Sequence, residues 1–224
     1  MSVDTNNAAF QDALNLIQYT RQSVFLTGKA GTGKSTFLRY VCEHTKKKHV
    51  VLAPTGIAAI NAGGSTMHSF FKLPFYPLLP DDPNLSLQRG RIHEFFKYTK
   101  PHRKLLEQIE LVIIDEISMV RADLIDAIDR ILRVYSHNLR EPFGGKQLLL
   151  VGDVFQLEPV VKNDEREILN RAYLLHTSSR QEYSARSIWY PSSFRKYTGR
   201  LIPSLLAFST ISVPTPPEQP TCNC

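Results

Sequence analysis

Cysteine is scarce in this sequence, with three residues in 224. Cys42 stands by itself, and Cys222 and Cys224 lie too close together, without histidine partners, to form a zinc site. The composition therefore predicts a reducing compartment, no disulfide framework and no metal cluster. Long apolar runs are also missing, since none reaches the roughly 18 residues that a membrane-spanning helix needs. The N-terminal MSVDTNNAAF is too polar for a signal peptide, so we expect a cytosolic protein with no membrane partner.

The chain has only a small excess of positive charge, and this excess is unevenly distributed along the sequence. The chain carries 27 Lys and Arg against 21 Asp and Glu, a formal net charge of +6. Residues 174–224 hold five basic and two acidic residues, so half of the excess lies in that segment. The net charge by itself neither requires nor excludes a nucleic-acid partner. The length allows one ordinary domain whose core needs no covalent or metal support.

Short apolar runs alternate with helical patterns along the first 150 residues. Apolar runs that predict buried strands occupy 23–27, 49–53, 111–115 and 147–152. Helical spacing of apolar residues, or an Ala-rich stretch after a turn, predicts helices over 8–20, 34–44, 57–62 and 118–135. Residues 72–100 contain four prolines in KLPFYPLLPDDP and are expected to be irregular. This alternation predicts an α/β fold with a mostly parallel sheet covered on both faces, with ligands at the carboxyl ends of the strands.

The first strand leads into a complete phosphate-loop motif, GKAGTGKS, which opens the next helix. Glycines let backbone N–H groups wrap a triphosphate, and the start of the helix adds partial positive charge. We expect Lys34 to reach the β- and γ-phosphates and the Ser35 hydroxyl to bind Mg²⁺. The predicted nucleotide contacts are Gly28, Ala30, Gly31, Thr32, Gly33, Lys34, Ser35 and Thr36.

Two further strands end in residues suited to catalysis. LVIID ends at Asp115 and is followed by Glu116, so a buried strand delivers one carboxylate to the metal and the next toward the attacking water. For Asp115 the alternative is a helix N-cap, since a helical pattern begins just after it. Gln156, after the strand at 147–152, is a candidate to sense the γ-phosphate or to position water; its alternative is an ordinary surface loop residue. With Lys34, these three residues form the predicted catalytic set.

Four segments together resemble the petite-integration-frequency (Pif-type) family of superfamily 1 DNA helicases. They are FLTGKAGTGKST, VVLAPTGIAAINAGGSTMHSFF, LVIIDEISMV and REPFGGKQLLLVGDVFQLEPVV. The resemblance covers about residues 10–173 and implies a three-layer RecA-like motor domain that uses ATP and Mg²⁺ to move 5′ to 3′ on DNA, in DNA repair and recombination. It implies that Gln11 reads adenine and that an insert at about 72–98 helps to split the duplex. We expect a monomer that is cytoplasmic and nucleoid-associated in a bacterium, or nuclear or mitochondrial in a eukaryote.

The resemblance also implies a track for single-stranded DNA along two segments. The predicted DNA contacts are Pro54, Thr55, Gly56, His68 and Phe70. A turn with N–H groups and a hydroxyl suits a phosphate, and an aromatic ring suits a base, since stacking contributes about 1–3 kcal/mol per base. For Phe70 and Phe71 the alternative is core packing, and the sequence assigns one of the two to the core without deciding which.

After Tyr173 the composition changes: the chain becomes rich in Ser, Thr and Pro and shows no sustained periodicity of apolar residues. We interpret 1–173 as the motor domain and 174–224 as a disordered tail that is foreign to the family. Read two nucleotides later with permitted codons, the tail resembles the next conserved stretch of the family, which suggests an out-of-frame translation. The second RecA-like domain, with the arginine that completes the ATP site, is not recognisable. We therefore expect ATP·Mg²⁺ binding, weak binding of single-stranded DNA, very slow hydrolysis and no unwinding.

Two other classes of protein share the phosphate loop. A nucleotide-binding switch or interaction module would have no reason to carry TGIAAINAGGSTMHSFF. A small-molecule kinase would need an arginine-rich lid after the third strand, where PFGGKQ stands instead. The switch module remains the main alternative to a helicase motor domain.

Overall fold

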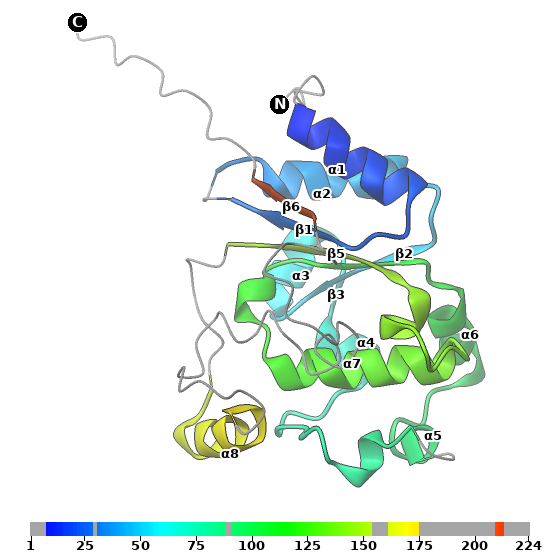
Figure 1. Ribbon diagram of the computed structural model, residues 1–224, viewed down its shortest axis with the longest axis vertical. Coiled ribbons are helices and arrows are strands. Elements are labelled where there is room, and N and C mark those ends of the chain that lie inside the picture. The colour runs from blue at the N-terminus through cyan, green and yellow to red at the C-terminus, as the bar shows by residue number, and fades with distance from the viewer. Residues whose placement is uncertain (1–7, 29–30, 88–90, 154–160, 175–208, 213–224) are drawn as a thin grey trace, which may run out of the picture.

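The computed structural model describes residues 8–28, 31–87, 91–153, 161–174 and 209–212, which form a sheet between two layers of helices (Figure 1). The sheet has the order β3-β2-β4-β5-β1-β6, and every pairing is parallel. Its strands are β1 (Val24–Thr27), β2 (His49–Ala53), β3 (Ser65–Thr66), β4 (Leu111–Ile114), β5 (Gln147–Gly152) and β6 (Ser209–Ser212). The predicted α/β class and its four central strands are confirmed.

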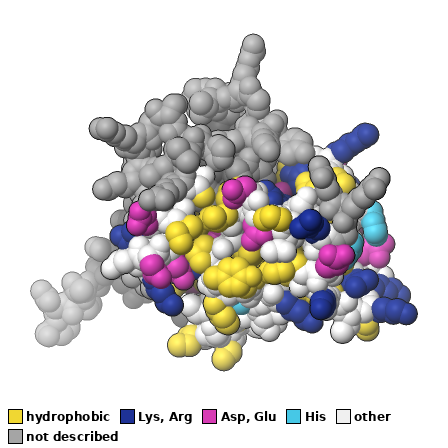
Figure 2. Space-filling model, turned by 90° about the horizontal axis from the view of Figure 1, so that it is seen from below, with side chains coloured by type: hydrophobic (Ala, Val, Ile, Leu, Met, Phe, Trp, Pro, Cys, Tyr) yellow, Lys and Arg dark blue, Asp and Glu magenta, His cyan; other side chains and the backbone are white. Residues whose placement is uncertain are grey.

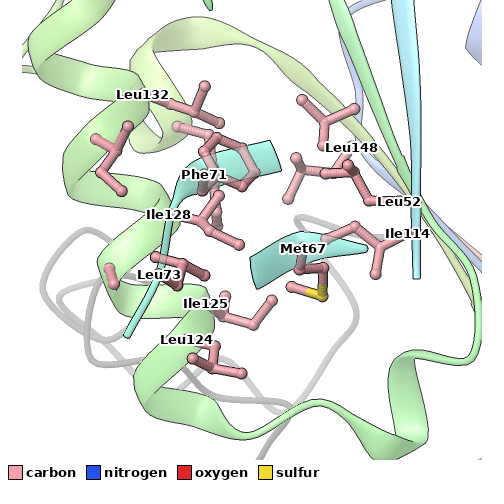
Figure 3. Close-up of a cluster of buried hydrophobic side chains, with 14 of the residues drawn as sticks. Leu52, Met67, Phe71, Leu73, Ile114, Leu124, Ile125, Ile128, Leu132 and Leu148 are labelled. Atoms are coloured by element: carbon pink, nitrogen blue, oxygen red, sulfur yellow. The ribbon is translucent and has the colours of Figure 1, made fainter. Parts of the chain in front are cut away.

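Successive residues of the central strands pack into two separate cores, because neighbouring side chains of a strand point to opposite faces. In β4, Val112 and Ile114 belong to one core, whereas Leu111 and Ile113 belong to the other. The first core lies against α4 (Met67–Phe71), α6 (Lys100–Gln108) and α7 (Ala122–Tyr135), and Figure 3 shows its centre. The second lies against α1 (Ala8–Tyr19) and α2 (Lys34–His44), with α3 (Gly56–Ala62) beside α2. Continuous apolar strands are therefore explained by burial on both faces.

The helices of the structure differ from the predicted ones in two ways: one begins later than predicted, and others were not predicted. The helix expected from residue 118 begins at Ala122, because the short 3₁₀ helix η2 (Ile117–Met119) separates it from β4. The stretch expected to be irregular contains η1 (Pro83–Leu85) and α5 (Arg91–Phe95). Helices α4 and α6 were not predicted, and α8 (Asn163–Leu174) follows the last central strand. Among the helices of the described ranges, none is long and apolar enough to cross a membrane.

Helix α7 is buried on nearly all sides, including charged residues that the helical pattern places toward solvent. The Asp129 carboxylate accepts a bond of 2.7 Å from Arg133 Nε and one of 2.6 Å from the Phe143 N–H. Arg133 also donates to the Leu139 carbonyl at 2.9 Å. The polar face is covered because it binds the segment containing η3 (Pro142–Gly145) that leads into β5.

Replacement of Asp129 by Ala should destabilise the fold by about 3–5 kcal/mol, because it leaves the Arg133 guanidinium buried without its carboxylate. For a chain of this size, that loss corresponds to a thermal midpoint lowered by roughly 6–20 °C. Thermal unfolding followed by circular dichroism measures the change. Asp12→Ala, the same substitution at an exposed position of α1, is the matched control. Equal midpoints for the two variants would show that the buried ion pair contributes nothing.

Side chains of α7 hold the segment 72–87 in place through hydrogen bonds to the backbone of that segment. The Asp123 carboxylate accepts a bond of 3.1 Å from the Leu78 N–H, and Arg130 donates to the carbonyls of Leu85 and Pro80. Asp123 is itself held by two bonds from Arg121, at 3.0 and 2.9 Å. An irregular, proline-rich segment thus takes a defined position because α7 supplies its hydrogen-bond partners.

Strand β6 lies inside the segment 174–224, for which the sequence predicts no packed element. The structure pairs Val24–Thr27 with Ser209–Ser212, at the edge of the sheet next to β1. For these four residues the predicted disorder is wrong, because the structure places them in a strand of the sheet. The division of the chain at Tyr173 stays a prediction, and most of 174–224 falls outside the described residues.

Candidate nucleotide site and nucleic-acid interface

The phosphate loop joins the end of β1 to the first turn of α2. Two of its glycines adopt left-handed backbone conformations, with φ of 79° at Gly31 and 90° at Gly33, the residue that caps α2. No heavy atom lies within 4 Å of a Cβ built at either glycine, so the requirement for glycine is conformational rather than one of space. Of the predicted nucleotide contacts, Ala30 falls outside the described residues.

Lys34 is the first residue of α2, and its side chain folds back over the loop. Its ammonium Nζ donates to the Gly28 carbonyl at 2.6 Å, which joins the two ends of the motif. Thr32 is buried, whereas Ser35 is exposed and Thr36 is half-buried. The loop therefore has a fixed cation and a solvent-accessible hydroxyl at one helix start, which is the donor set that a triphosphate and Mg²⁺ require.

The acidic pair stands at the end of β4, separated from β1 by β5 alone among the described strands. The Asp115 N–H donates to the Leu52 carbonyl of β2 at 2.9 Å, and its Oδ1 accepts from the Glu116 N–H at 3.0 Å. Glu116 adopts a left-handed conformation, with φ 51° and ψ 44°, which is uncommon for a residue with a side chain. This left-handed turn ends β4, and α7 begins only at Ala122. Asp115 is therefore not the N-cap of that helix, which was the alternative interpretation of its role.

Both carboxyl groups are affected by burial and by each other. Burial raises the pKa of Asp115, while the Glu116 N–H and the Lys34 charge oppose that rise. Burial also raises the pKa of Glu116, and the negative charges of Asp115 and Asp153 raise it further against the opposing Lys34. The Lys34 ammonium thus acts on both acids, so the structure brings together three of the four predicted catalytic residues. The fourth, Gln156, falls outside the described residues.

Asp153 is a member of this cluster that the sequence interpretation missed. It follows Gly152 directly at the end of β5, is buried, and its charge raises the pKa of Glu116. The signal was present, because an acidic residue directly after a central parallel strand lies at the ligand-binding edge.

Gln11, predicted to read adenine, is exposed on α1. The preceding residue, Phe10, packs edge-on against Phe37 and Tyr40 of α2, with ring centroids 4.9 and 5.2 Å apart. Helix α1 is therefore packed on the same helix that the phosphate loop opens. This arrangement is compatible with an adenine contact, which stays a prediction.

The predicted DNA contacts follow β2 and β3, the neighbouring strands beyond β4. Thr55 caps α3, and its Oγ1 accepts from the Ala58 N–H at 3.2 Å, with Pro54 before it and Gly56 as the first helical residue. The next turn is also tightly specified, since a Cβ at Gly64 would lie 2.2 Å from the Val51 carbonyl oxygen. The Thr55 turn lies beside the nucleotide site, because Leu52 of the same strand accepts the Asp115 N–H.

His68 and Phe70 lie on α4, directly after β3. The question of which phenylalanine belongs to the core is resolved: Phe71 is fully buried, whereas Phe70 is half-buried and contacts Phe71 and His102. The His68 ring stacks on Phe75, with centroids 5.1 Å apart and planes 14° apart. Burial lowers the pKa of His68, and the nearby Arg121 lowers it further, against Asp123.

Comparison with known proteins fits this geometry. The sequence profile of the PIF1-like helicases matches residues 4–188, which is most of the chain. The chain belongs to the PIF1-like helicase family. The match extends beyond Tyr173, the boundary that the sequence predicts for the motor domain.

Individual relatives agree with that assignment. The ATP-dependent DNA helicase RRM3 of Saccharomyces cerevisiae is 33% identical over 202 residues, which are 87% of this chain and 26% of the relative. The ATP-dependent DNA helicase Pif1 of Campylobacter jejuni is 37% identical over 159 residues, 70% of this chain and 33% of the relative. The chain thus spans a quarter to a third of the length of these two relatives.

Solved structures of the same family share the fold. Bacteroides Pif1 bound to single-stranded DNA superposes with a TM-score of 0.66 at 49% identity, over 77% of this chain and 37% of that one. Unliganded Pif1 from Bacteroides gives a TM-score of 0.72 at 41% identity, over 95% of this chain and 42% of that one. These comparisons confirm the resemblance that the sequence motifs indicate.

Proposed function

We propose that this chain is the ATP-binding motor domain of a 5′-to-3′ DNA helicase, with its domain at 1–173 and an insert at about 72–98. One observation carries the proposal: the ammonium of Lys34, at the start of α2, acts on the carboxyl groups of Asp115 and Glu116, at the end of β4, and lowers the pKa of both against the effect of burial. Relatives named ATP-dependent DNA helicases and a relative solved with single-stranded DNA support it.

The described loop fits a bound nucleotide. Left-handed glycines direct backbone N–H groups into a cradle, and Lys34 exchanges its bond to the Gly28 carbonyl for the β- and γ-phosphates. Ser35 and Asp115 would hold Mg²⁺, which would supply positive charge to offset the negative charge of the triphosphate. Glu116 orients and deprotonates the attacking water, a task that suits a carboxylate whose pKa burial and neighbouring negative charge raise above its ordinary value. Gln11 contacts adenine, and Gln156 senses the γ-phosphate.

The strand of DNA lies along the turn after β2 and along α4. A hydroxyl that accepts one bond still donates its own proton, so Thr55 can cap α3 and bind a phosphate at once. His68 and Phe70 lie on α4, directly after the strand that pairs with β2, and both rings are only half-buried. The Leu52 carbonyl of β2 accepts a hydrogen bond from the Asp115 N–H. A movement of Asp115 and Glu116 on nucleotide binding would therefore be transmitted through β2 to the DNA contacts that follow it.

A polypeptide of these 224 residues should bind ATP·Mg²⁺ but hydrolyse it slowly and without unwinding. By the resemblance, the arginine that completes the site belongs to a second RecA-like domain, and such arginines contribute about 10³–10⁵ in rate. Rapid hydrolysis that single-stranded DNA stimulates would contradict this expectation.

Single-stranded DNA should raise the thermal midpoint of the chain in the presence of a non-hydrolysable ATP analogue. The affinity, measured by anisotropy of a labelled oligo(dT), should fall about 7- to 20-fold between 50 and 200 mM salt for two to three phosphate contacts. Thr55→Ala should weaken binding, whereas Thr45→Ala, at the far end of α2, is the control. An analogue that binds without any DNA-dependent shift would instead favour a nucleotide-binding switch module.

A further inference from the structure

An aromatic ring outside the predicted DNA contacts is held with most of its surface in water. Phe75 is 82% exposed, the highest exposure among the large hydrophobic side chains described. One of its faces lies on the imidazole of His68, at 5.1 Å and nearly parallel. A single exposed apolar residue is common on protein surfaces, but Phe75 is followed by the exposed ring of Tyr76, and a group of exposed apolar rings is typical of a surface that binds a ligand.

The loop that carries Phe75 is fixed on both sides. Leu73 and Leu78 are buried in the core shared with α7, and Pro74 and Pro77 restrict the backbone between them. The Leu73 N–H donates to the His68 carbonyl at 3.0 Å, and the Leu78 N–H donates to the buried Asp123 carboxylate at 3.1 Å. The ring is therefore pre-organised, so a ligand that covers it does not have to order the loop.

The surroundings favour a nucleobase as that ligand. His68 and Phe75 form a ledge that continues the proposed track from α4, and His68 and Thr55 lie at the same edge of the sheet because each follows one of the paired strands β3 and β2. Lys72, exposed directly after α4, brings positive charge to the start of this loop, with its ammonium 5.9 Å from the centroid of the Tyr98 ring. Figure 2, seen from below the view of Figure 1, shows apolar side chains gathered on that face, with both basic and acidic side chains among and around them.

We propose that the outer face of Phe75 stacks on a base of the bound single strand, with His68 as its backing ring. The proposal rests on the proposed function and adds a binding residue from the proline-rich segment to the track. A phenyl ring offers no hydrogen bond to base edges, so the contact carries little sequence preference. Because stacking involves no ion pair, it contributes to affinity without adding to the salt dependence.

The test uses the 224-residue chain and an oligo(dT) with a single 2-aminopurine, moved stepwise along the strand. Phe75→Ala and Phe75→Leu should weaken binding about 5- to 100-fold, whereas Phe75→Trp should retain it. At one position of the probe, the fluorescence quenching that the wild type causes should be lost in the Ala and Leu variants. The slope of log affinity against log salt should stay unchanged. Tyr19→Ala, which removes an exposed ring from α1 on the other side of the sheet, is the control.

The outcomes separate this inference from the proposed function. If the wild type binds single-stranded DNA and the Ala and Leu variants bind equally well with equal quenching, Phe75 does not stack on a base, and the proposed motor function is unaffected. A weaker variant with a shallower salt slope would also overturn it, because the loop would then be positioning a phosphate contact. If the wild type binds no single-stranded DNA, both proposals fall.

Discussion

Replacement of Lys34 by Ala should weaken binding of a Mg²⁺·ATP analogue about 10- to 150-fold. The ammonium now donates to the Gly28 carbonyl of the phosphate loop, and a hydrogen bond to a charged group contributes about 1.5–3 kcal/mol. Isothermal titration calorimetry with the purified chain measures the affinity directly.

A second effect of the same substitution comes from the acidic pair. The Lys34 charge lowers the pKa of both Asp115 and Glu116 against the effect of burial, so its removal lets both values rise further. Metal binding requires the carboxylate form, and the affinity of the variant should therefore begin to fall at a higher pH than that of the wild type when the pH is lowered. Lys46→Ala, at an exposed lysine after α2, is the control. Equal affinities for Lys34→Ala and the wild type would remove the basis of the motor assignment.

The parts of the fold that the sequence predicts well are those set by local chemistry. Buried parallel strands require continuous apolar runs, and the left-handed turns of the phosphate loop require Gly31 and Gly33. A helix whose first residue follows such a turn, α2, is found over the predicted residues 34–44. Each of these features depends on neighbours in the chain, so one sequence is enough to locate it.

The parts that the sequence does not reveal depend on distant partners. Asp123, Asp129 and Arg133 of α7 have the spacing of a solvated face, yet they are buried because separate segments cover them and supply their partners. Helix α4, with five residues, has too few residues to be stable by itself and forms through packing of Met67 and Phe71.

The candidate site shows the same division. Lys34, Asp115 and Glu116 could be assigned because each follows a recognisable strand, whereas the left-handed backbone of Glu116 is visible only in the structure. Asp153 also follows a strand, but its importance comes from its electrostatic effect on Glu116, which is 37 residues earlier in the chain. Sequence therefore locates the residues, and the tertiary structure determines how their charges interact.

Replacement of Glu116 by Gln should reduce hydrolysis about 10²- to 10⁴-fold while leaving nucleotide binding in place. The amide keeps the size of the side chain but cannot accept the proton of the attacking water. Single-turnover hydrolysis of labelled ATP, with the chain in excess, measures the slow rate, and calorimetry measures the binding. Glu94→Gln, at an exposed position of α5, is the control.

The same variant should stabilise the protein in the absence of nucleotide, and this gain should depend on pH. The folded-state pKa of Glu116 lies above the ordinary value of 4.5, through burial and through the charges of Asp115 and Asp153. Its ionised form therefore destabilises the fold above the raised pKa, and that effect disappears as the pH falls below about 4.5, where Glu116 is protonated in both states. The thermal midpoint of Glu116→Gln should exceed that of the wild type at pH 8 and converge with it near pH 4. A gain in stability that is the same at both pH values would show that relief of the strained backbone or of packing, and not removal of a buried charge, is its cause.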